Sequence, residues 1–162
     1  MTFESLRTEI LVVDGRQSPT ALAAARGTMR LLLSLGFCCV SELALASGRR
    51  ADLVALAVDG ELWIVEIKSS IADFRADGKW SEYRWHCDRL FFATAPGVPL
   101  DIFPQDAGLI LADGYGAAIV REAPGHRLAG ATRRSMSLRF ARTAALRLQS
   151  LVDPAGGYEA EF

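Results

Sequence analysis

The sequence predicts a single α/β domain in which helices flank one mixed β-sheet. Helix and strand patterns follow one another in the order helix, three strands, helix and strand, then further strands and a final helix. The dipeptide Asp59-Gly60, between two apolar runs, is typical of a β-hairpin. The 162 residues are 51% hydrophobic, which is ample material for one core.

The first helix is expected to begin at Ser18-Pro19, where serine caps the helix and proline occupies its first position, and to end at Gly36. Its inward stripe comprises Leu22, Ala25, Met29 and Leu32. Strands are expected at 37–45, 51–57, 61–69, 90–95, 108–112 and 117–121, with a second hairpin turn at Asp113-Gly114.

A second helix is expected at about 71–86, with an irregularity at Gly78. Asp73 is well placed to complete a helix cap that begins at Ser70, which would give Asp73 a structural role. A basic helix at about 137–152 closes the chain. Its expected inward stripe comprises Leu138, Ala141, Ala145, Leu148 and Val152.

The cysteines and the apolar runs exclude several classes of protein. No segment resembles a membrane span or a signal peptide, so we expect a cytoplasmic protein without a membrane partner. Cys38, Cys39 and Cys87 fit a reducing compartment. Neighbouring strand residues point to opposite faces, so Cys38 and Cys39 are poor joint zinc ligands, even with His86 nearby. We interpret the three as buried free thiols.

The net charge of −1 hides a basic strip at residues 121–149, where seven arginines stand against the single acid Glu122. Such a strip is typical of a phosphate-binding surface, and equally of a solvated helix face. The arginines that we assign to DNA contact are Arg133, Arg134, Arg139, Arg142 and Arg147, together with Arg49 and Arg50 before the second strand.

Glu66 and Lys68 form the centre of the candidate site. They are separated by one residue of an apolar strand, so both point to the same face and Ile67 to the other. Buried charges need partners or a metal. Lysine is also rare in this chain, which has two lysines among its 18 basic residues, and its choice at this position favours a compact point charge.

The turn decides whether Asp52 joins this pair. A two-residue turn makes opposed residue numbers sum to 119 and pairs Asp52 with Ile67, on the wrong face. A three-residue turn ending in a left-handed Gly60 gives 118 and sets Asp52 opposite Glu66. Two facing carboxylates would suit a hard divalent cation. The alternative is a surface salt-bridge cluster, which is common on hairpins.

A longer motif carries a resemblance. Arg50-Ala-Asp52 with Val65-Glu66-Ile67-Lys68 resembles the PD-(D/E)xK nuclease superfamily, although the proline before the aspartate is absent. The stretch Glu66-Ile-Lys-Ser-Ser-Ile-Ala-Asp73-Phe-Arg-Ala-Asp77-Gly-Lys79-Trp80-Ser-Glu-Tyr83, with Cys87-Asp88-Arg-Leu-Phe-Phe-Ala and Gly108-Leu-Ile-Leu-Ala-Asp113, is similar to the MmcB-like bacterial DNA-repair family. The resemblance covers roughly residues 37–125.

The resemblance implies a restriction-endonuclease-like fold in one domain, residues 1–162, and a role in DNA repair. It implies that Asp52, Glu66 and the carbonyl of Ile67 bind Mg²⁺, or Mn²⁺ in its place, and that Lys68 orients the attacking water. Lys79-x-x-x-Tyr83 stands where many relatives carry Gln-x-x-x-Tyr, so both residues join the expected catalytic set. For Tyr83, ordinary packing of the helix on the sheet is an equal alternative. Glu42 is a further metal-side acid or, equally, an exposed charge at a strand end.

Three functions follow as hypotheses. The first is a Mg²⁺-dependent deoxyribonuclease, favoured by the complete Asp-Glu-Lys set. The second is a DNA-binding or scaffold protein that keeps the fold without turnover. The third is an oligomerisation module that uses the last helix, as a homodimer or with DNA-repair partners. The sequence leaves open the DNA structure recognised and the choice between endo- and exonuclease action.

Overall fold

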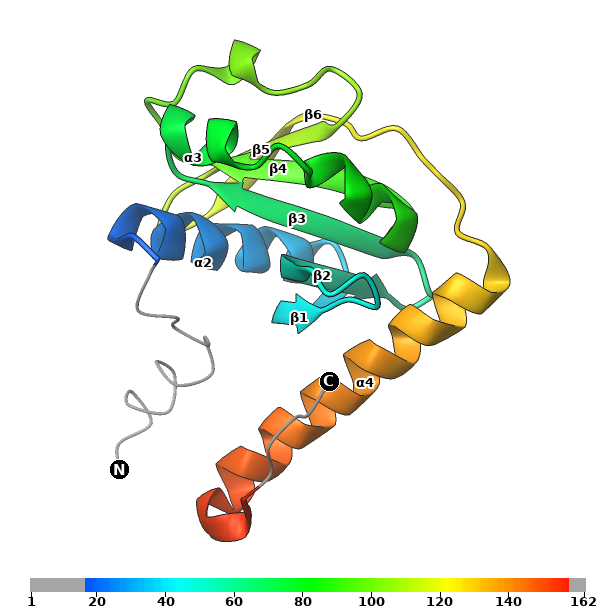
Figure 1. Ribbon diagram of the computed structural model, residues 1–162. Helices are drawn as coiled ribbons and strands as arrows, with labels where there is room; N and C mark the ends of the chain where they lie inside the picture. Colours follow the sequence, from blue (N-terminus) through cyan, green and yellow to red (C-terminus); the bar gives the residue numbers. More distant parts are fainter. Residues whose placement is uncertain (1–16, 158–162) are drawn as a thin grey trace.

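The computed structural model describes residues 17–157, which form one sheet with helices on both faces (Figure 1). The strands are β1 Phe37–Ala44, β2 Arg50–Ala57, β3 Leu62–Lys68, β4 Arg89–Thr94, β5 Gly108–Ala112 and β6 Ala117–Arg121. The α-helices are α2 Pro19–Ser34, α3 Ile71–Ala76 and α4 Gly130–Val152. Short 3₁₀ helices are η1 Trp80–His86, η2 Leu100–Ile102 and η3 Pro154–Gly156.

The six strands lie in the sheet in chain order. β1, β2 and β3 form an antiparallel meander, β4 and β5 run parallel to β3, and β6 returns antiparallel to β5. The parallel step from β3 to β4 requires a crossover, which α3 and η1 provide. This arrangement confirms the predicted mixed sheet flanked by helices.

α2 covers one face of the sheet, and α3, η1 and the first half of α4 cover the other (Figure 1). Ala24, Ala25 and Leu32 of α2 are buried in the core between this helix and the sheet. Gly27 lets α2 touch the turn between β5 and β6, because a Cβ at this position would lie 2.1 Å from the carbonyl oxygen of Asp113. A larger residue would push the helix off the sheet.

Both expected serine caps are present. The Ser18 hydroxyl accepts a hydrogen bond from the backbone N–H of Ala21 at 3.1 Å. The Ser70 hydroxyl accepts one from the N–H of Asp73 at 3.1 Å, and the Asp73 carboxylate accepts one from the N–H of Ser69 at 2.9 Å. Asp73 therefore has the structural role that the sequence predicts.

The helix expected at 71–86 is divided near Gly78 into α3 and η1. A 3₁₀ helix has three residues per turn, so residues three apart share a face. Tyr83 accordingly lies on the same side as Trp80, and both pack against the core. Lys79 precedes η1 and is exposed.

α4 corrects two expectations. It begins seven residues before 137, at Gly130, and it buries Met136, Phe140 and Thr143. The stripe expected to face inward is exposed, and comprises Leu138, Ala141, Ala145, Leu148 and Val152. The helix carries two apolar stripes, and the apolar residues of β1 and η1 select the one that contains Met136 and Phe140.

The cysteines differ from one another in burial. Cys87 is buried, Cys39 is half-buried and Cys38 is exposed on the edge strand, so the expectation of three buried thiols is wrong for Cys38. Burial raises the pKa of Cys87 to about 12, which makes it a small apolar side chain at neutral pH. Among residues 17–157, no helix combines the length and the apolar character that a membrane crossing needs.

Candidate functional site

The hairpin of β2 and β3 has the register that a three-residue turn predicts. Leu53 pairs with Val65 and Leu56 with Leu62, which is the register in which residue numbers sum to 118. Gly60 has a φ of +87°, in the left-handed region. Its N–H donates to the carbonyl of Ala57 at 3.0 Å and closes the turn. Because the turn fixes this register, Asp52 lies opposite Glu66, one position beyond the pair of Leu53 and Val65.

Asp52 and Glu66 are each held by a hydrogen bond from the main chain of the facing strand. The backbone N–H of Asp52 donates to Oε1 of Glu66 at 3.1 Å, and the N–H of Ile67 donates to Oδ2 of Asp52 at 2.7 Å. Each carboxylate thus has one oxygen held by the main chain. Within residues 17–157, the other oxygen of each accepts no hydrogen bond. The structure therefore brings the two predicted acids together with one oxygen apiece to spare.

Lys68 lies beside this pair but is held mainly by another acid. Its Nζ is 2.8 Å from Oδ2 of Asp77 and 3.8 Å from Oε2 of Glu66. Asp77 occupies the break between α3 and η1, and the sequence interpretation gave it no role. The signal was present in the Asp77-Gly78 pair, because such a pair often ends a helix and turns the chain back. Asp77 is thus the missing partner of Lys68.

Burial shifts the proton equilibria of the site. It raises the pKa of Glu66 well above the usual value, and the negative charge of Asp52 raises it further. Burial also raises the pKa of Asp52, against the lowering effect of the Ile67 N–H. Burial alone would lower the pKa of Lys68, but the hydrogen bond to Asp77 and the charge of Glu66 outweigh it and raise the pKa. Lys68 is therefore positively charged at neutral pH, beside two carboxyl groups whose raised pKa values disfavour their charged forms.

Tyr83 and Arg49 form the cover of the site. The Tyr83 hydroxyl donates to the carbonyl of Arg50 at 3.1 Å, and burial raises the pKa of Tyr83 well above its usual value. The Arg49 guanidinium lies 5.4 Å from the centre of the Tyr83 ring. Its Nε is 2.7 Å from Glu82, and its Nη1 is 3.7 Å from Asp77. Beneath this cover the side chain of Glu66 is only 3% exposed and that of Lys68 8%.

Glu42 lies on β1, and its backbone has a φ of +51°, which is uncommon for a residue with a side chain. Its carboxylate accepts a hydrogen bond from Nε2 of Gln17 at 2.7 Å and forms an ion pair with Arg50. The structure therefore ties Glu42 to neighbouring side chains, and Arg50 to Glu42. Lys79 has no ion pair within residues 17–157 and is exposed before η1.

The arginines of α4 fall into two groups. Arg133 donates to both oxygens of Asp88 at 2.7 Å and to the carbonyl of Gly60 at 2.6 Å. Arg147 points to Ser41 and the backbone carbonyl of Glu42 on β1, and burial lowers its pKa. The others form no ion pair within residues 17–157, and comprise Arg134, Arg139 and Arg142.

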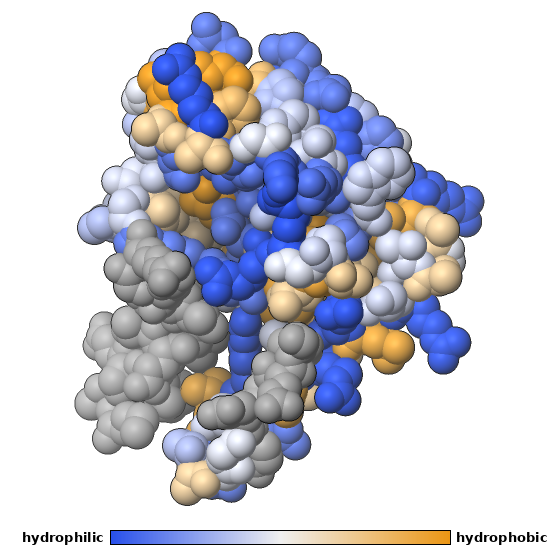
Figure 2. All heavy atoms as spheres, viewed as in Figure 1, coloured by the Kyte–Doolittle hydropathy of each residue, from blue (hydrophilic) through white to orange (hydrophobic). Residues whose placement is uncertain are grey.

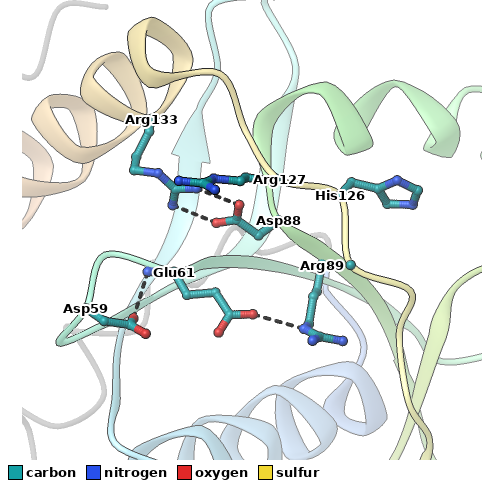
Figure 3. A pocket seen from close by; sticks show the side chains of 8 residues that line it. Asp59, Glu61, Asp88, Arg89, His126, Arg127 and Arg133 are labelled. Carbon is teal, nitrogen blue, oxygen red and sulfur yellow. Dashed lines mark hydrogen bonds and ion pairs between the residues drawn. The ribbon is translucent and has the colours of Figure 1, made fainter.

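A hollow of about 530 Å³ lies at the opposite end of β3 (Figure 3). Figure 3 shows Arg133 directed at Asp88 and Arg89 directed at Glu61, and Nε of Arg89 is 2.9 Å from Oε1 of Glu61. Asp88 also accepts hydrogen bonds from two backbone N–H groups. The two ion pairs of this hollow, Arg133 with Asp88 and Arg89 with Glu61, have a structural role. Asp59, His126 and Arg127 also line it and form no ion pair within residues 17–157.

The donor set at Asp52 and Glu66 suits a hard cation. Mg²⁺ takes oxygen ligands and is often held by one or two carboxylates, with water and phosphate oxygens completing its shell. Each carboxylate has one oxygen that accepts no hydrogen bond within residues 17–157, and that of Glu66 lies 3.8 Å from Nζ of Lys68. The backbone carbonyl of Ile67 is the further ligand that the resemblance implies. Within residues 17–157, no group of three or more His, Cys, Asp and Glu side chains gathers as a metal site. The pair therefore fits Mg²⁺ chemically and would hold it together with water and substrate.

The mixed sheet, its flanking helices and the acidic end of β3 define an α/β protein consistent with a restriction-endonuclease-like fold. The chain belongs to the MmcB-like DNA-repair family, because the model of that family, described as DNA repair protein MmcB-like, matches residues 8–155. No curated protein matches the chain.

A solved structure of a protein of unknown function from Silicibacter pomeroyi is similar to the chain, with 44% identity and a TM-score of 0.84. The match covers 90% of this chain and 99% of the other. It extends the shared fold over nearly the whole molecule.

Proposed function

We propose that the protein is a Mg²⁺-dependent deoxyribonuclease that acts in DNA repair. The observation that carries this proposal is the carboxylate pair of Asp52 and Glu66, which lies next to Lys68 and has one oxygen on each acid that accepts no hydrogen bond within residues 17–157. The family supplies the DNA-repair context. A structural ion pair would have no need for two adjacent carboxylates with raised pKa values.

Each residue has a distinct task in this proposal. Asp52, Glu66 and the carbonyl of Ile67 would hold Mg²⁺, which polarises the scissile phosphate and lowers the pKa of a bound water. The backbone N–H groups of Asp52 and Ile67 fix both carboxylates in place. Lys68 faces the developing negative charge with its ammonium group, which Asp77 orients.

The cover sets a condition on this activity. Phosphate reaches Glu66 and Lys68 only if Arg49 moves away from Glu82 and Asp77. Arg49 is a cation on a turn beside the site, so a DNA phosphate can replace the two carboxylates as its partner. On this basis Arg49 follows the backbone of the bound DNA, as the sequence predicts.

A catalytically silent DNA-binding protein is the second candidate. The burial of the site also agrees with this candidate. The ammonium group of Lys68 is 2.8 Å from Asp77 and the side chain of Glu66 is 3% exposed, as expected of a site that no longer binds substrate. The two candidates differ in one respect. A retired site has no use for a metal.

The test incubates the wild-type chain with duplex, nicked, flapped and single-stranded DNA and Mg²⁺ or Mn²⁺. Glu66→Gln keeps the shape of the side chain but removes its charge, and Glu122→Gln is the matched control on an exposed glutamate. We expect weak, Mn²⁺-enhanced cleavage that Glu66→Gln eliminates and Glu122→Gln retains.

Lys68→Ala should lose cleavage by a factor of about 10² or more while it keeps Mn²⁺ binding in calorimetry, because the lysine does not ligate the ion. If the wild type binds DNA but cuts none of the four substrates with either metal, the scaffold function is correct. If Lys68→Ala cuts as well as the wild type, the role assigned to the lysine is wrong.

A further inference from the structure

Trp85 lies on the outer side of η1 and is 75% exposed. The other two tryptophans of the chain, Trp63 and Trp80, pack within the core or against it. An indole as exposed as that of Trp85 contributes little to folding, because an apolar side chain stabilises a protein through the surface that it buries. Its flat ring system remains open to a ligand.

The period of η1 places Trp85 next to the cover of the carboxylate site. In a 3₁₀ helix residues three apart share a face, so Trp85 lies on the same face as Glu82, about 6 Å further along the helix. Glu82 is 2.7 Å from Nε of Arg49, which lies over the ring of Tyr83. Trp85 is therefore one helical turn away from the contact that a DNA phosphate must replace to reach Lys68.

The other end of η1 lies near an arginine of α4. Figure 1 shows η1, in green, in front of the sheet, with its last turn toward the first half of α4, and the two helices are in contact. Burial lowers the pKa of His86, and the positive charge of Arg139 lowers it further. Arg139 is thus close to the residue that follows Trp85.

The charges along η1 suit a polyanion. Two acids form ion pairs at this helix, each with an arginine, and the pairs are Glu82 with Arg49 and Asp106 with Arg84. Lys79 at the start of η1 and Arg139 near its end are cations that form no ion pair within residues 17–157. Figure 2, in the same view, shows mostly hydrophilic side chains over the middle of this face. An exposed indole in cationic, polar surroundings favours a nucleic acid over the apolar surface of a protein.

The form of DNA that such an indole can bind follows from the geometry of the bases. In a duplex both faces of a base are covered by its neighbours in the stack. An aromatic side chain therefore stacks on a base that is unpaired, as in a single strand, a flap or a gap.

We propose that Trp85 is a stacking platform for an unpaired base, so that the carboxylate site takes DNA with a single-stranded segment. This inference rests on the proposed function, because it names the class of DNA that the site binds. The phosphates on either side of the stacked base lie toward Arg49 and Arg139, and the strand continues from there to Glu66 and Lys68.

Binding of a labelled oligothymidylate and of a duplex of equal length, measured by fluorescence anisotropy with a chelator present, tests the platform. We expect Trp85→Ala to weaken single-strand binding by a factor of about ten or more and to leave duplex binding nearly unchanged. The matched control is Tyr115→Ala, because Tyr115 is 86% exposed in the turn between β5 and β6, beside α2. It should change neither affinity.

Two further variants distinguish stacking from apolar contact. Trp85→Phe keeps an aromatic ring and should retain most of the single-strand affinity. Trp85→Leu keeps apolar bulk without a flat ring and should bind as weakly as Trp85→Ala. A stacked base also quenches tryptophan fluorescence, so the single strand should quench the wild type and not Trp85→Phe. This measurement on the wild type serves if Trp85→Ala fails to fold.

Several results would overturn the platform. They are equal single-strand affinity in Trp85→Ala and the wild type, an equal loss for single strand and duplex, a Trp85→Leu variant that binds like the wild type, and wild-type fluorescence that the single strand leaves unchanged. The chelator keeps this test separate from that of the nuclease. A protein that stacks the base and cuts no DNA retains the platform and loses the nuclease, whereas one that cuts DNA and ignores Trp85→Ala does the reverse.

Discussion

A buried acid lies at each end of β3, and the surroundings of the two acids shift their pKa values in opposite directions. At the N-terminal end, Asp88 accepts hydrogen bonds from the N–H groups of Leu62 and Leu128 and two more from Arg133. Burial would raise the pKa of Asp88, but these donors outweigh it and lower the pKa. At the C-terminal end, Glu66 faces Asp52, and burial and that like charge raise its pKa.

The difference separates an acid that holds the fold together from one that is available for chemistry. Asp88 has a donor for each oxygen and stabilises its own charged form. Glu66 keeps a spare oxygen and is destabilised when charged, so it gains by binding a cation. Burial alone does not tell the two apart. The number of donors and the direction of the pKa shift do.

The largest effect on stability is expected at the N-terminal end. Asp88→Asn removes the charge that Arg133 and two N–H groups share, and we expect the free energy of unfolding to fall by about 2–3 kcal/mol. The control is Asp106→Asn, because the Asp106 side chain is 63% exposed and its pair with Arg84 should contribute less than about 1 kcal/mol. Urea unfolding measures both. Equal losses would contradict the comparison.

Glu66→Gln should act in the opposite direction, measured with a chelator present. In the folded protein the charged carboxylate of Glu66 is destabilised by burial and by the charge of Asp52. The neutral amide of glutamine removes this cost. We expect the free energy of unfolding at neutral pH to stay the same or to rise by up to about 1 kcal/mol. A loss as large as that of Asp88→Asn would show that Glu66 is a structural anchor.

The pH dependence of the two variants should differ in sign. The folded-state pKa of Glu66 is raised above 4.5, so its unfavourable contribution appears as the pH rises from this value through the folded pKa. The advantage of Glu66→Gln over the wild type therefore grows with pH. The pKa of Asp88 is lowered below 3.8, so its favourable contribution is lost as the pH falls through the folded pKa. The deficit of Asp88→Asn therefore shrinks in acid. Melting curves of the three proteins across this range decide the matter.

The sequence narrowed the register of the site to two alternatives, because a short turn controls it. Gly60 provides the left-handed conformation, and the three-residue turn then sets the partner of every residue in β3. The pairing of Asp52 with Glu66 follows from that register, whereas the two-residue turn that the sequence also allowed would have separated them. Local rules of this kind also predict both serine caps and the β5–β6 hairpin.

The remaining features depend on contacts distant in the sequence. Arg133 finds Asp88 across 45 positions, and only the parallel pairing of β3 with β4 brings Asp88 there. The face that α4 buries depends on β1 and η1, so periodicity alone selected the wrong stripe. Asp77 meets Lys68 only because the helix breaks at Gly78. In each case the sequence supplied the residue but not its partner.

The smallest effect is expected at the arginines of α4, and it extends the same contrast between paired and available groups. Arg139 and Arg142 form no ion pair within residues 17–157, so both are available to phosphate, whereas Arg133 is committed to Asp88. Replacing Arg139 and Arg142 with alanine should weaken DNA binding and reduce the salt dependence by roughly one unit of slope for each lost contact.

Arg134→Ala should reduce the salt slope less than the double variant does, because it removes a single exposed arginine of the same helix. Arg133→Ala should lower stability as Asp88→Asn does, and leave the salt slope of the folded protein unchanged, since its charge already has a partner. Fluorescence anisotropy with a duplex at several salt concentrations measures both affinity and slope. An unchanged slope in the Arg139 and Arg142 double variant would return this strip to a solvated helix face. A reduced slope in Arg133→Ala would mean that DNA competes with Asp88 for the same guanidinium, and the division between structural and available charges would then fail at this helix.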